Sequence, residues 1–185
     1  MQNLDVFFLL RPDVIFLNHG SFGACPRPVF EAYQRWQLQL EIQPAAFLDP
    51  ARGLSGWMRD ARTAMAAMLG TSAENIVGLT NATYALNIVA QSLDLKPGDE
   101  ILTTDHEYAA LEKTWSYVCR NTGAVIKVVE VALPLTDEPQ FTAAILAGFT
   151  DKTRVLFLSH ITSATALVFR LNTRLPRPAS AASIP

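Results

Sequence analysis

The sequence has 185 residues, which is enough for one large domain or for part of a longer protein. Half of the residues are hydrophobic and 17% are charged, so the chain can bury a core and is not intrinsically disordered. The formal net charge of −2 at pH 7 gives no reason to expect a nucleic acid or an anionic membrane as a partner.

The sequence shows no pattern that indicates secretion or membrane insertion. The apolar run at 6–10 follows an acidic residue and has no basic segment before it, unlike a signal peptide. No apolar run approaches the roughly 20 residues that span a bilayer. Cys25 and Cys119 form no CxxC motif and fit a reducing compartment better than a disulfide framework. We therefore expect a soluble, cytoplasmic protein.

Residues 1–26 predict an irregular N-terminal arm, with a turn at 18–23 that is rich in glycine and polar side chains. Within residues 27–70, two helices are predicted, at about 28–43 and 52–69. Prolines are typical of a first helical turn, and a glycine at position 70 suits the end of the second helix. The second helix is expected to bury one face, formed by Leu54, Trp57, Met58, Ala61, Met65 and Met68.

Residues 71–169 alternate between strand and helix patterns, which predicts an α/β fold with a mostly parallel sheet covered by helices. Strands are expected at 76–79, 100–104, 124–131 and 154–158, and helices at about 82–93, 108–121 and 139–148. Parallel sheets bind ligands beyond the carboxyl ends of their strands. The turns at 80–83, 104–108 and 159–165 are therefore the expected location of a site.

The strand, turn and helix at 76–93 form the most informative stretch. Asn81, Ala82 and Thr83 lie where the strand becomes the helix, so unpaired N–H groups and the positive end of the helix dipole point outward. Such a terminus binds anions, most often phosphate, although a plain N-cap is the alternative interpretation. The apolar residues that share one face of this helix, and are expected in the core, are Leu86, Val89, Ala90 and Leu93.

Residues 170–185 differ in character from the rest of the sequence. They are rich in Arg, Pro, Ala and Ser, lack acidic residues and show no helical or strand periodicity, which predicts a disordered tail. We interpret this segment as the non-native product of a frameshift or of gene degradation. Reading the downstream DNA in the other frames tests this interpretation.

Four stretches, at 16–23, 80–87, 97–108 and 159–165, resemble in this order the class V aminotransferase family of enzymes that use pyridoxal 5′-phosphate (PLP). The resemblance is closest to the isopenicillin N epimerase-like branch, with the cysteine desulfurases as more distant relatives. It covers about residues 14–169 and implies the N-terminal part of the large domain of the aspartate aminotransferase-like fold, with an incomplete sheet. It also implies a homodimeric parent enzyme that acts on an amino acid or amine by transamination, epimerisation or C–S cleavage.

The resemblance further implies a set of cofactor-binding residues. Ala82 and Thr83 would hold the PLP phosphate through their backbone N–H groups and the Thr83 hydroxyl. Tyr108 stands where the family places a ring that stacks on the pyridine, and a half-buried aromatic at a helix start is the alternative. Ser163 stands where a polar side chain approaches the phenolic oxygen of the cofactor. No metal site is predicted.

The three histidines receive different interpretations. Asn18 and His19 correspond to the arm that approaches the substrate in the family, while a plain turn histidine is the alternative for His19. Histidine is a common general base, but His106 precedes the stacking position by two residues, so we do not expect it to have that role. His160 ends a strand and is expected to orient the loop that carries Ser163.

The resemblance places two further groups after the stretch at 159–165, in segments that this sequence does not contain. They are the lysine that binds PLP as a Schiff base and the aspartate that pairs with the pyridinium nitrogen. The lysines of the chain are poor substitutes by position: Lys96, Lys113, Lys127 and Lys152. The sequence also has Ala166 and Arg170 where the family usually has glycine and proline. We therefore expect no catalytic residue in this chain, weak PLP binding and no turnover by the chain alone.

Two other interpretations stay open. The chain may be read as a non-catalytic α/β module that associates with another chain through an exposed sheet edge, so that it is marginally stable or oligomeric by itself. A nucleotide-binding α/β domain ranks last, because both the G-x-G-x-x-G and the P-loop patterns are missing. Binding of PLP without binding of ATP or NAD distinguishes the PLP interpretation from the nucleotide one.

Overall fold

The computed structural model describes residues 4–134 and 138–169 of the chain. The chain divides into two compact units, residues 1–78 and 79–185, which we call the N-terminal unit and the C-terminal unit. The disordered and non-native tail that the sequence predicts at 170–185 lies outside the described residues.

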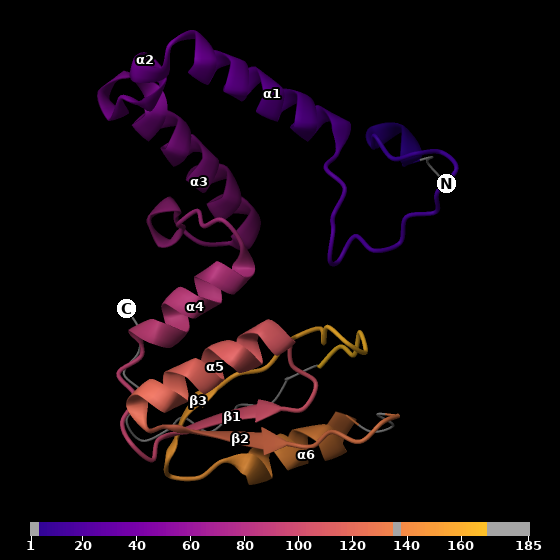
Figure 1. Ribbon diagram of the computed structural model, residues 1–185, viewed down its shortest axis with the longest axis vertical. Coiled ribbons are helices and arrows are strands. Elements are labelled where there is room, and N and C mark those ends of the chain that lie inside the picture. The colour runs from indigo at the N-terminus through magenta and orange to yellow at the C-terminus, as the bar shows by residue number, and fades with distance from the viewer. Residues whose placement is uncertain (1–3, 135–137, 170–185) are drawn as a thin grey trace. The chain divides into compact units, whose positions relative to one another are not determined.

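The N-terminal unit is helical and follows an arm of turns. Its elements are η1 (Asp5–Phe7), α1 (Arg27–Ile42), α2 (Pro44–Leu48), η2 (Pro50–Leu54), α3 (Ser55–Leu69) and η3 (Ala73–Asn75) (Figure 1). Both predicted helices are present as α1 and α3. As predicted, α3 ends at Gly70, whose φ of 67° lies in the left-handed region that glycine adopts without a steric penalty.

Two short helical elements, α2 and η2, fill the segment between α1 and α3, which the sequence was expected to leave mostly as a loop. Pro44 and Pro50 each begin one of them, at a position where the missing N–H costs no hydrogen bond. The Asp49 carboxylate caps η2 by accepting from the N–H of Ala51 at 2.9 Å. Proline and an Asx cap therefore start helical turns here instead of preventing them.

An aromatic cluster joins the three helices of the N-terminal unit. The ring centroids of Trp36 on α1 and Trp57 on α3 are 5.0 Å apart, and Phe47 on α2 lies 6.0 Å from the first and 5.0 Å from the second. These are distances at which aromatic pairs attract one another in tilted and edge-to-face arrangements. The cluster fixes the turn from α1 through α2 into α3.

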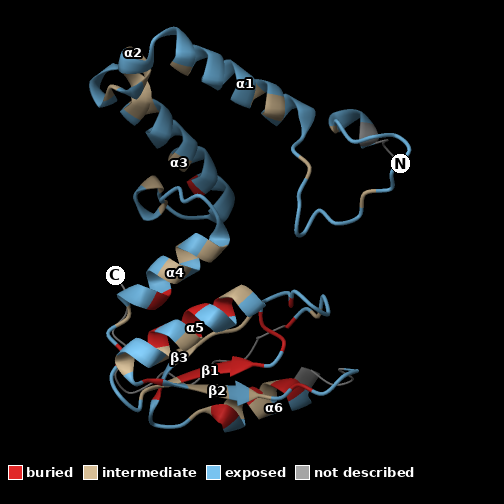
Figure 2. Ribbon diagram, in the orientation of Figure 1, coloured by how far each residue is buried: buried red, intermediate tan, exposed pale blue. Residues whose placement is uncertain are grey.

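The expected buried face of α3 is wrong. Met58, Met65 and Met68 are exposed, and Ala66 is the buried residue of this helix (Figure 2). Within the N-terminal unit α3 contacts the short elements next to it, η2 and η3, and these are too small to cover its length. The apolar periodicity of the helix is real, but the described part of this unit supplies no surface large enough to bury it.

The C-terminal unit is an α/β structure. Its elements are α4 (Ala82–Ser92), β1 (Glu100–Thr104), α5 (Ala109–Thr122), β2 (Val125–Val129), α6 (Glu138–Gly148) and β3 (Thr153–Leu156). The three strands pair in the order β2–β1–β3, and both pairings are parallel. The mostly parallel sheet with covering helices, which the sequence predicts, is confirmed.

The central strand β1 divides the core of this unit into two layers. Ile101 and Leu102 have no exposed surface and, as neighbours on one strand, face opposite sides of the sheet. On the first side Ile101 packs with Trp115 of α5, and on the second Leu102 packs with Ile145 of α6. Figure 1 shows α5 and α6 on opposite sides of the sheet, and both helices carry buried residues in Figure 2.

The strand expected at 76–79 is not formed. These residues are extended but pair with no strand among the residues that the structure describes, and Val77 is 76% exposed. A β-strand is stabilised by hydrogen bonds to a neighbouring strand, and apolar composition alone does not supply them. Parallel pairing is observed for the other three expected strands, each of which has a partner.

The face that α4 buries agrees with the prediction in part. Ala90 is buried in the core with Ile101, and Leu93 packs against this core, whereas Leu86 and Val89 are exposed. A hydrogen bond between Asn87 and Thr114 adds a polar contact with α5. No helix in the described residues is both long and apolar enough to cross a membrane.

The two cysteines are expected to react with iodoacetamide at different rates. Cys25 is exposed, whereas burial raises the pKa of the Cys119 thiol above its ordinary value. A raised pKa lowers the thiolate fraction at pH 8, and the thiolate is the nucleophile. Cys25 should therefore be alkylated several-fold faster, as measured by mass spectrometry of peptides from a time course. The unfolded protein is the control, in which the two cysteines should react at similar rates. Equal rates in the folded protein as well would contradict the burial of Cys119.

Candidate functional site

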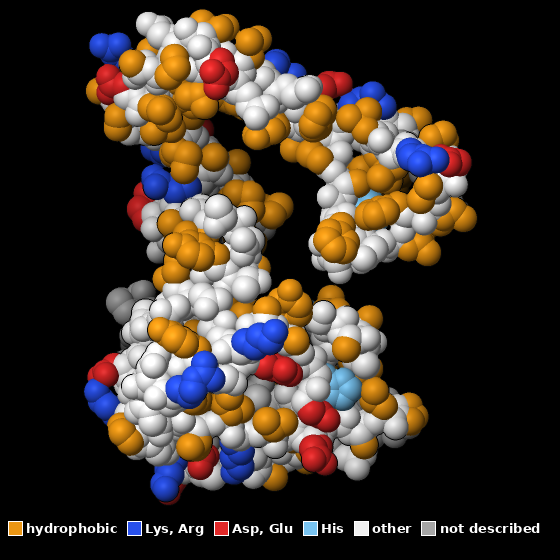
Figure 3. All heavy atoms as spheres, in the orientation of Figure 1, with side chains coloured by type: hydrophobic (Ala, Val, Ile, Leu, Met, Phe, Trp, Pro, Cys, Tyr) orange, Lys and Arg blue, Asp and Glu red, His pale blue; other side chains and the backbone are white. Residues whose placement is uncertain are grey.

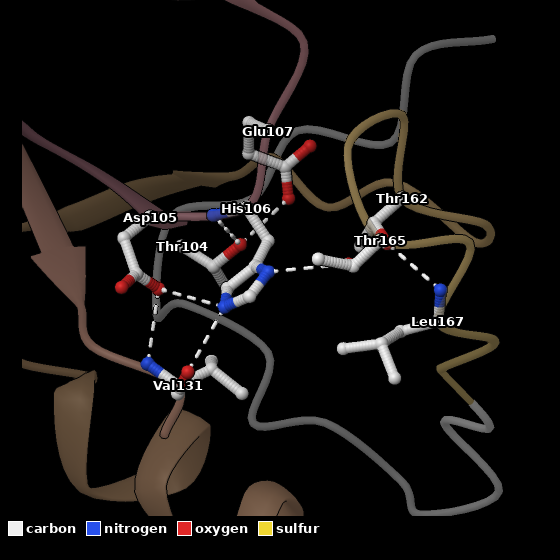
Figure 4. A network of polar contacts seen from close by, with 8 residues as sticks. All are labelled: Thr104, Asp105, His106, Glu107, Val131, Thr162, Thr165 and Leu167. Atoms are coloured by element: carbon white, nitrogen blue, oxygen red, sulfur yellow. Dashed lines mark hydrogen bonds and ion pairs between the residues drawn. The ribbon is translucent and has the colours of Figure 1, made fainter. Parts of the chain in front are cut away.

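The segments that follow β1 and β3 meet at one edge of the sheet. Residues 105–108 follow β1 directly, and Ser159 and the turn at 162–167 follow β3. Because both strands are parallel, their carboxyl ends lie at the same edge, which is where ligands bind in sheets of this kind. Figure 4 shows side chains from these segments pointing toward one another.

Glu107 ties the two segments together. Its side chain is buried, with 7% of the residue exposed, and both carboxylate oxygens accept from the N–H of Ser159, at 3.1 and 3.0 Å. The Ser159 hydroxyl donates to Oε2 at 2.5 Å, and the Thr104 hydroxyl donates to Oε1 at 3.0 Å. A buried carboxylate is costly unless donors surround it, and here β1 and the end of β3 supply them.

His106 makes a second link, at the same edge. The residue is buried, with 8% of its surface exposed. Its Nε2 lies 2.9 Å from the carbonyl oxygen of Val131, which follows β2. Nδ1 lies 3.3 Å from the hydroxyl of Thr165 in the turn after β3. The carboxylate of Asp105 accepts from the N–H of Val131 at 2.9 Å and lies 3.7 Å from Nε2 (Figure 4). One histidine thus connects the ends of all three strands.

The turn at 162–167 is closed by its own hydrogen bonds. Thr162, which is 2% exposed, accepts from the N–H of Leu167 through its hydroxyl at 2.9 Å and shares a hydrogen bond of 2.7 Å with the hydroxyl of Thr165. The backbone of Thr162 also donates to the carbonyl oxygen of Leu167 at 2.9 Å. Ser163 lies within this turn with its side chain exposed.

The N-terminus of α4 has the geometry of an anion site. The side chain of Asn81 accepts from the N–H of Tyr84 at 2.8 Å, so it caps the third residue of the helix. The N–H groups of Ala82 and Thr83 have no acceptor among the described residues. Both interpretations of this turn are therefore compatible: Asn81 is an N-cap, and two N–H groups remain for a ligand.

The N-termini of α4 and α5 lie at the same end of the C-terminal unit. The Asn87 side chain donates to the carbonyl oxygen of Thr83 at 2.9 Å and accepts from the hydroxyl of Thr114 at 3.2 Å, so equivalent turns of the two helices face each other. Figure 1 shows the two helices running in the same direction. Tyr108, at the N-cap of α5, is 46% exposed.

The structure thus gathers Ala82, Thr83, Tyr108 and Ser163 at one end of the C-terminal unit. Asn18 and His19 belong to the N-terminal unit, where both are exposed. There the ring of His19 packs edge-on against Phe16, with centroids 4.8 Å apart, and its Nδ1 accepts from the N–H of Ala24 at 3.4 Å. Their proximity to a substrate stays a prediction.

The sequence interpretation missed the part that His106 plays. It expected His160 to orient the loop of Ser163, but the Nδ1 of His160 lies 3.1 Å from the carbonyl oxygen of Phe169, which follows that turn, so its effect on Ser163 stays a prediction. His106 does contact the turn itself, through Thr165, which is 59 positions away in the sequence. The available signal was the polar triplet Asp105–Glu107 directly after a buried strand.

The lysines lie where the sequence places them. Lys96 and Lys152 are in turns, Lys113 is on the exposed side of α5 and Lys127 is in β2. The described residues contain no group of His, Cys, Asp and Glu side chains arranged to hold a metal ion.

Replacing Ala166 with glycine is expected to stabilise the protein by up to about 1 kcal/mol. Ala166 has a φ of 53°, in the left-handed region, where a non-glycine residue pays about 1–2 kcal/mol that glycine avoids. Part of the gain is lost because glycine makes the unfolded chain more flexible. Urea denaturation measures the change. Ala164→Gly in the same turn is the control and should destabilise, and a gain from both variants would contradict the strain at position 166.

The sequence of this chain matches a family of known proteins. The family model described as aminotransferase class-V matches residues 24–173, and the chain belongs to this family. Over 160 residues the chain is 34% identical to isopenicillin N epimerase of Streptomyces clavuligerus, an alignment that covers 86% of this chain and 40% of the epimerase. Over 159 residues it is 37% identical to a probable cysteine desulfurase of Vibrio cholerae, covering 82% of this chain and 38% of that protein.

Solved structures agree with the family assignment. A mutant of C-DES with glycine covalently linked to its PLP cofactor superposes with a TM-score of 0.80 at 25% identity, covering 92% of this chain and 44% of C-DES. A second structure describes C-DES as a cystine C–S lyase in complex with cysteine persulfide, with a TM-score of 0.74 and 27% identity over 84% of this chain and 41% of the other. The chain therefore spans about two fifths of the length of these relatives.

Proposed function

We propose that the C-terminal unit forms the phosphate- and ring-binding part of a PLP site. The observation that carries this proposal is the N-terminus of α4, where Asn81 caps the N–H of Tyr84 and the N–H groups of Ala82 and Thr83 remain available. Two N–H donors at the positive end of a helix dipole suit a phosphate dianion. A similar structure in the same family carries PLP.

The other residues at this end of the unit fit the cofactor as well. Tyr108 exposes its ring beside the N-terminus of α5 and offers an aromatic face to the pyridine ring. Ser163 presents an exposed hydroxyl from the turn after β3, which suits a hydrogen bond to the phenolic oxygen. These residues bind and orient, while PLP itself supplies an electron sink for a carbanion next to nitrogen.

We propose that the whole protein acts on an amino acid or amine, by epimerisation, transamination or C–S cleavage. The support is the family, whose similar members include an epimerase and a cystine C–S lyase. The residues of this chain hold the cofactor but supply no lysine at this end of the sheet, because the four lysines lie in other turns or on α5 and β2. We expect the chain alone to bind PLP weakly and to turn nothing over.

The test is a titration of the purified chain with PLP, followed by tryptophan fluorescence, with inorganic phosphate as competitor. Thr83→Ala should weaken PLP binding about tenfold, because it removes one hydrogen bond to a charged group. Thr63→Ala on α3 is the matched control, since its hydroxyl donates to the carbonyl oxygen of Arg59 far along the sequence from α4. Equal PLP affinity of the Thr83 variant and the parent, or binding of ATP or NAD instead of PLP, would overturn the proposal.

A second candidate function, association with another chain, has one observation in its favour. The N-terminal unit exposes large apolar side chains along two helices: Val29, Tyr33, Trp36, Leu38 and Ile42 on α1, and Met58, Met65, Met68 and Leu69 on α3. Apolar surfaces of this extent are typical of interfaces. Figure 3 shows hydrophobic side chains gathered over these elements. We propose self-association, as in a homodimeric parent. Sedimentation velocity tests it, and a monomer with a sharp, cooperative thermal transition would contradict it.

A further inference from the structure

We propose that His106 is a positioning residue for the turn at 162–167. In this assignment the ring is neutral, carries its proton on Nε2 and holds Thr165 through Nδ1. The turn presents Ser163, so the functional consequence of this role rests on the proposed PLP site. The tautomer of His106 and its contact with the turn do not depend on the proposed PLP site.

The partner of Nε2 fixes the position of the ring proton. Nε2 lies 2.9 Å from the carbonyl oxygen of Val131, and a carbonyl oxygen can only accept a hydrogen bond. Nε2 must therefore donate. The N–H of Val131 is already directed at the carboxylate of Asp105, at 2.9 Å, so the backbone on both sides of Val131 is held in place.

The other ring nitrogen, Nδ1, then accepts the last hydrogen bond in a chain whose donors all point toward His106. The Thr165 hydroxyl donates to Nδ1 over 3.3 Å and accepts from the Thr162 hydroxyl over 2.7 Å. The Thr162 hydroxyl in turn accepts from the N–H of Leu167 over 2.9 Å (Figure 4). In this direction each hydroxyl donates once and accepts once, and both ring nitrogens are used.

The other protonation states satisfy fewer groups. If the proton moved from Nε2 to Nδ1, the lone pair of Nε2 would face the carbonyl oxygen of Val131 with no hydrogen between them. In an imidazolium, Nδ1 would donate to the Thr165 oxygen, and the Thr165 hydroxyl hydrogen would lose its acceptor among the described contacts. Asp105, 3.7 Å from Nε2, is the charged group beside the ring, and its carboxylate already accepts from Val131.

The hydrogen bonds within the turn hold a conformation that is strained at one residue. Ala166 has a φ of 53°, which an L-residue rarely adopts, so the contact with His106 adds support that the backbone preference of Ala166 does not give. Ser163, Ala164 and Thr165 are exposed and gain no stability from burial. The contact of Thr165 with His106 anchors this exposed part to the buried end of β1. Ser163 lies two residues before Thr165 in the sequence, so this contact also restrains Ser163.

The first measurement is the tautomer, by long-range ¹⁵N–¹H NMR of the full chain labelled at its three histidines. The resonance that disappears in His106→Asn identifies His106. The inference requires a neutral ring protonated on Nε2 at pH 7.5. An imidazolium, or a ring protonated on Nδ1, would overturn it.

The second measurement separates positioning from bulk stability. His106→Asn keeps an acceptor near the position of Nδ1, whereas His106→Leu and Thr165→Val remove the link to the turn. We expect the amide resonances of Ser163 and Ala164 to move in the Leu and Val variants and to stay near their parent positions in the Asn variant. PLP affinity should fall about tenfold in Thr165→Val, as for one lost polar link. Thr165 is exposed, so this variant is expected to fold even if His106→Leu does not.

The two proposals fail in different ways. If the parent chain does not bind PLP at all, the proposed function fails, while the tautomer and the amide shifts still decide the role of His106. If PLP binds but Thr165→Val leaves both the amide shifts and the affinity unchanged, the positioning role is refuted and the PLP site stands.

Discussion

Replacing Ile101 with alanine is expected to lower the free energy of unfolding of the C-terminal unit by about 3–4 kcal/mol. Ile101 has no exposed surface and lies on the central strand, where it packs against Trp115 and Val118 of α5. Truncation removes buried apolar contacts and leaves a cavity that the strands on either side cannot close, because their register with β1 is fixed by hydrogen bonds. Denaturation in urea, followed by circular dichroism, measures the loss.

Two companion variants make this expectation specific. Ile101→Val removes one methylene and should cost about 0.5–1.5 kcal/mol. Val125→Ala removes an exposed aliphatic side chain from β2 and should change stability by no more than about 0.5 kcal/mol. Since small domains have about 5–15 kcal/mol in total, the alanine variant of Ile101 can populate the unfolded state without denaturant. A loss below about 1 kcal/mol would mean that β1 is not the centre of the core.

Replacing Glu107 with alanine is expected to cost about 2–4 kcal/mol, although no cation faces it in the described hydrogen bonds. The substitution leaves the N–H and hydroxyl of Ser159 and the hydroxyl of Thr104 without their acceptor. These donors are partly or fully buried, so water replaces the carboxylate only in part. Thermal unfolding of the variant should show the loss directly.

Glutamine at the same position separates hydrogen bonding from charge. Glu107→Gln keeps one oxygen for Ser159 and places its amide group against the Thr104 hydroxyl, which can accept, so a loss of only about 0.5–1.5 kcal/mol is expected. Glu112→Gln, on the exposed first turn of α5, removes a charge without a buried hydrogen bond and should cost at most a few tenths, about 0.3 kcal/mol. Equal losses in the two glutamine variants would refute the role assigned to Glu107.

The sequence predicts the elements whose pattern can be recognised in neighbouring residues. Strand β1 and helix α5 follow from an apolar run, a polar turn and a periodic stretch closed by Gly123, whose φ of 78° ends the helix. The three paired strands and the parallel order follow from their alternation with helices. The start of α4 with Asn81 as its N-cap was predicted because a helix N-terminus can be recognised from neighbouring residues alone, and its role as a phosphate site stays a prediction.

Features that depend on distant contacts were not predicted correctly. The stretch at 76–79 has strand composition, but its state depends on a partner strand. Of the predicted buried face of α4, Ala90 and Leu93 do pack in the core, whereas Leu86 and Val89 are exposed and the more polar Asn87 contacts Thr114 of α5. The network around His106 joins residues up to 59 positions apart, and no local pattern in the sequence indicates such a pairing.

The aromatic cluster of α1, α2 and α3 has an optical consequence. Trp36 and Trp57 lie 5.0 Å apart in the N-terminal unit, while Trp115 is buried in the C-terminal unit. Two indoles at that separation couple their electronic transitions and give a circular dichroism signal in the near ultraviolet, whereas a single buried indole emits at shorter wavelength than an exposed one. Trp36 and Trp57 also emit, but they are exposed, so the shift of the emission maximum on unfolding reports mainly on Trp115. One unlabelled sample therefore carries two reporters of unfolding that weight the two units differently. If the dichroism and emission transitions do not coincide along a denaturant series, the two units unfold as independent cooperative blocks.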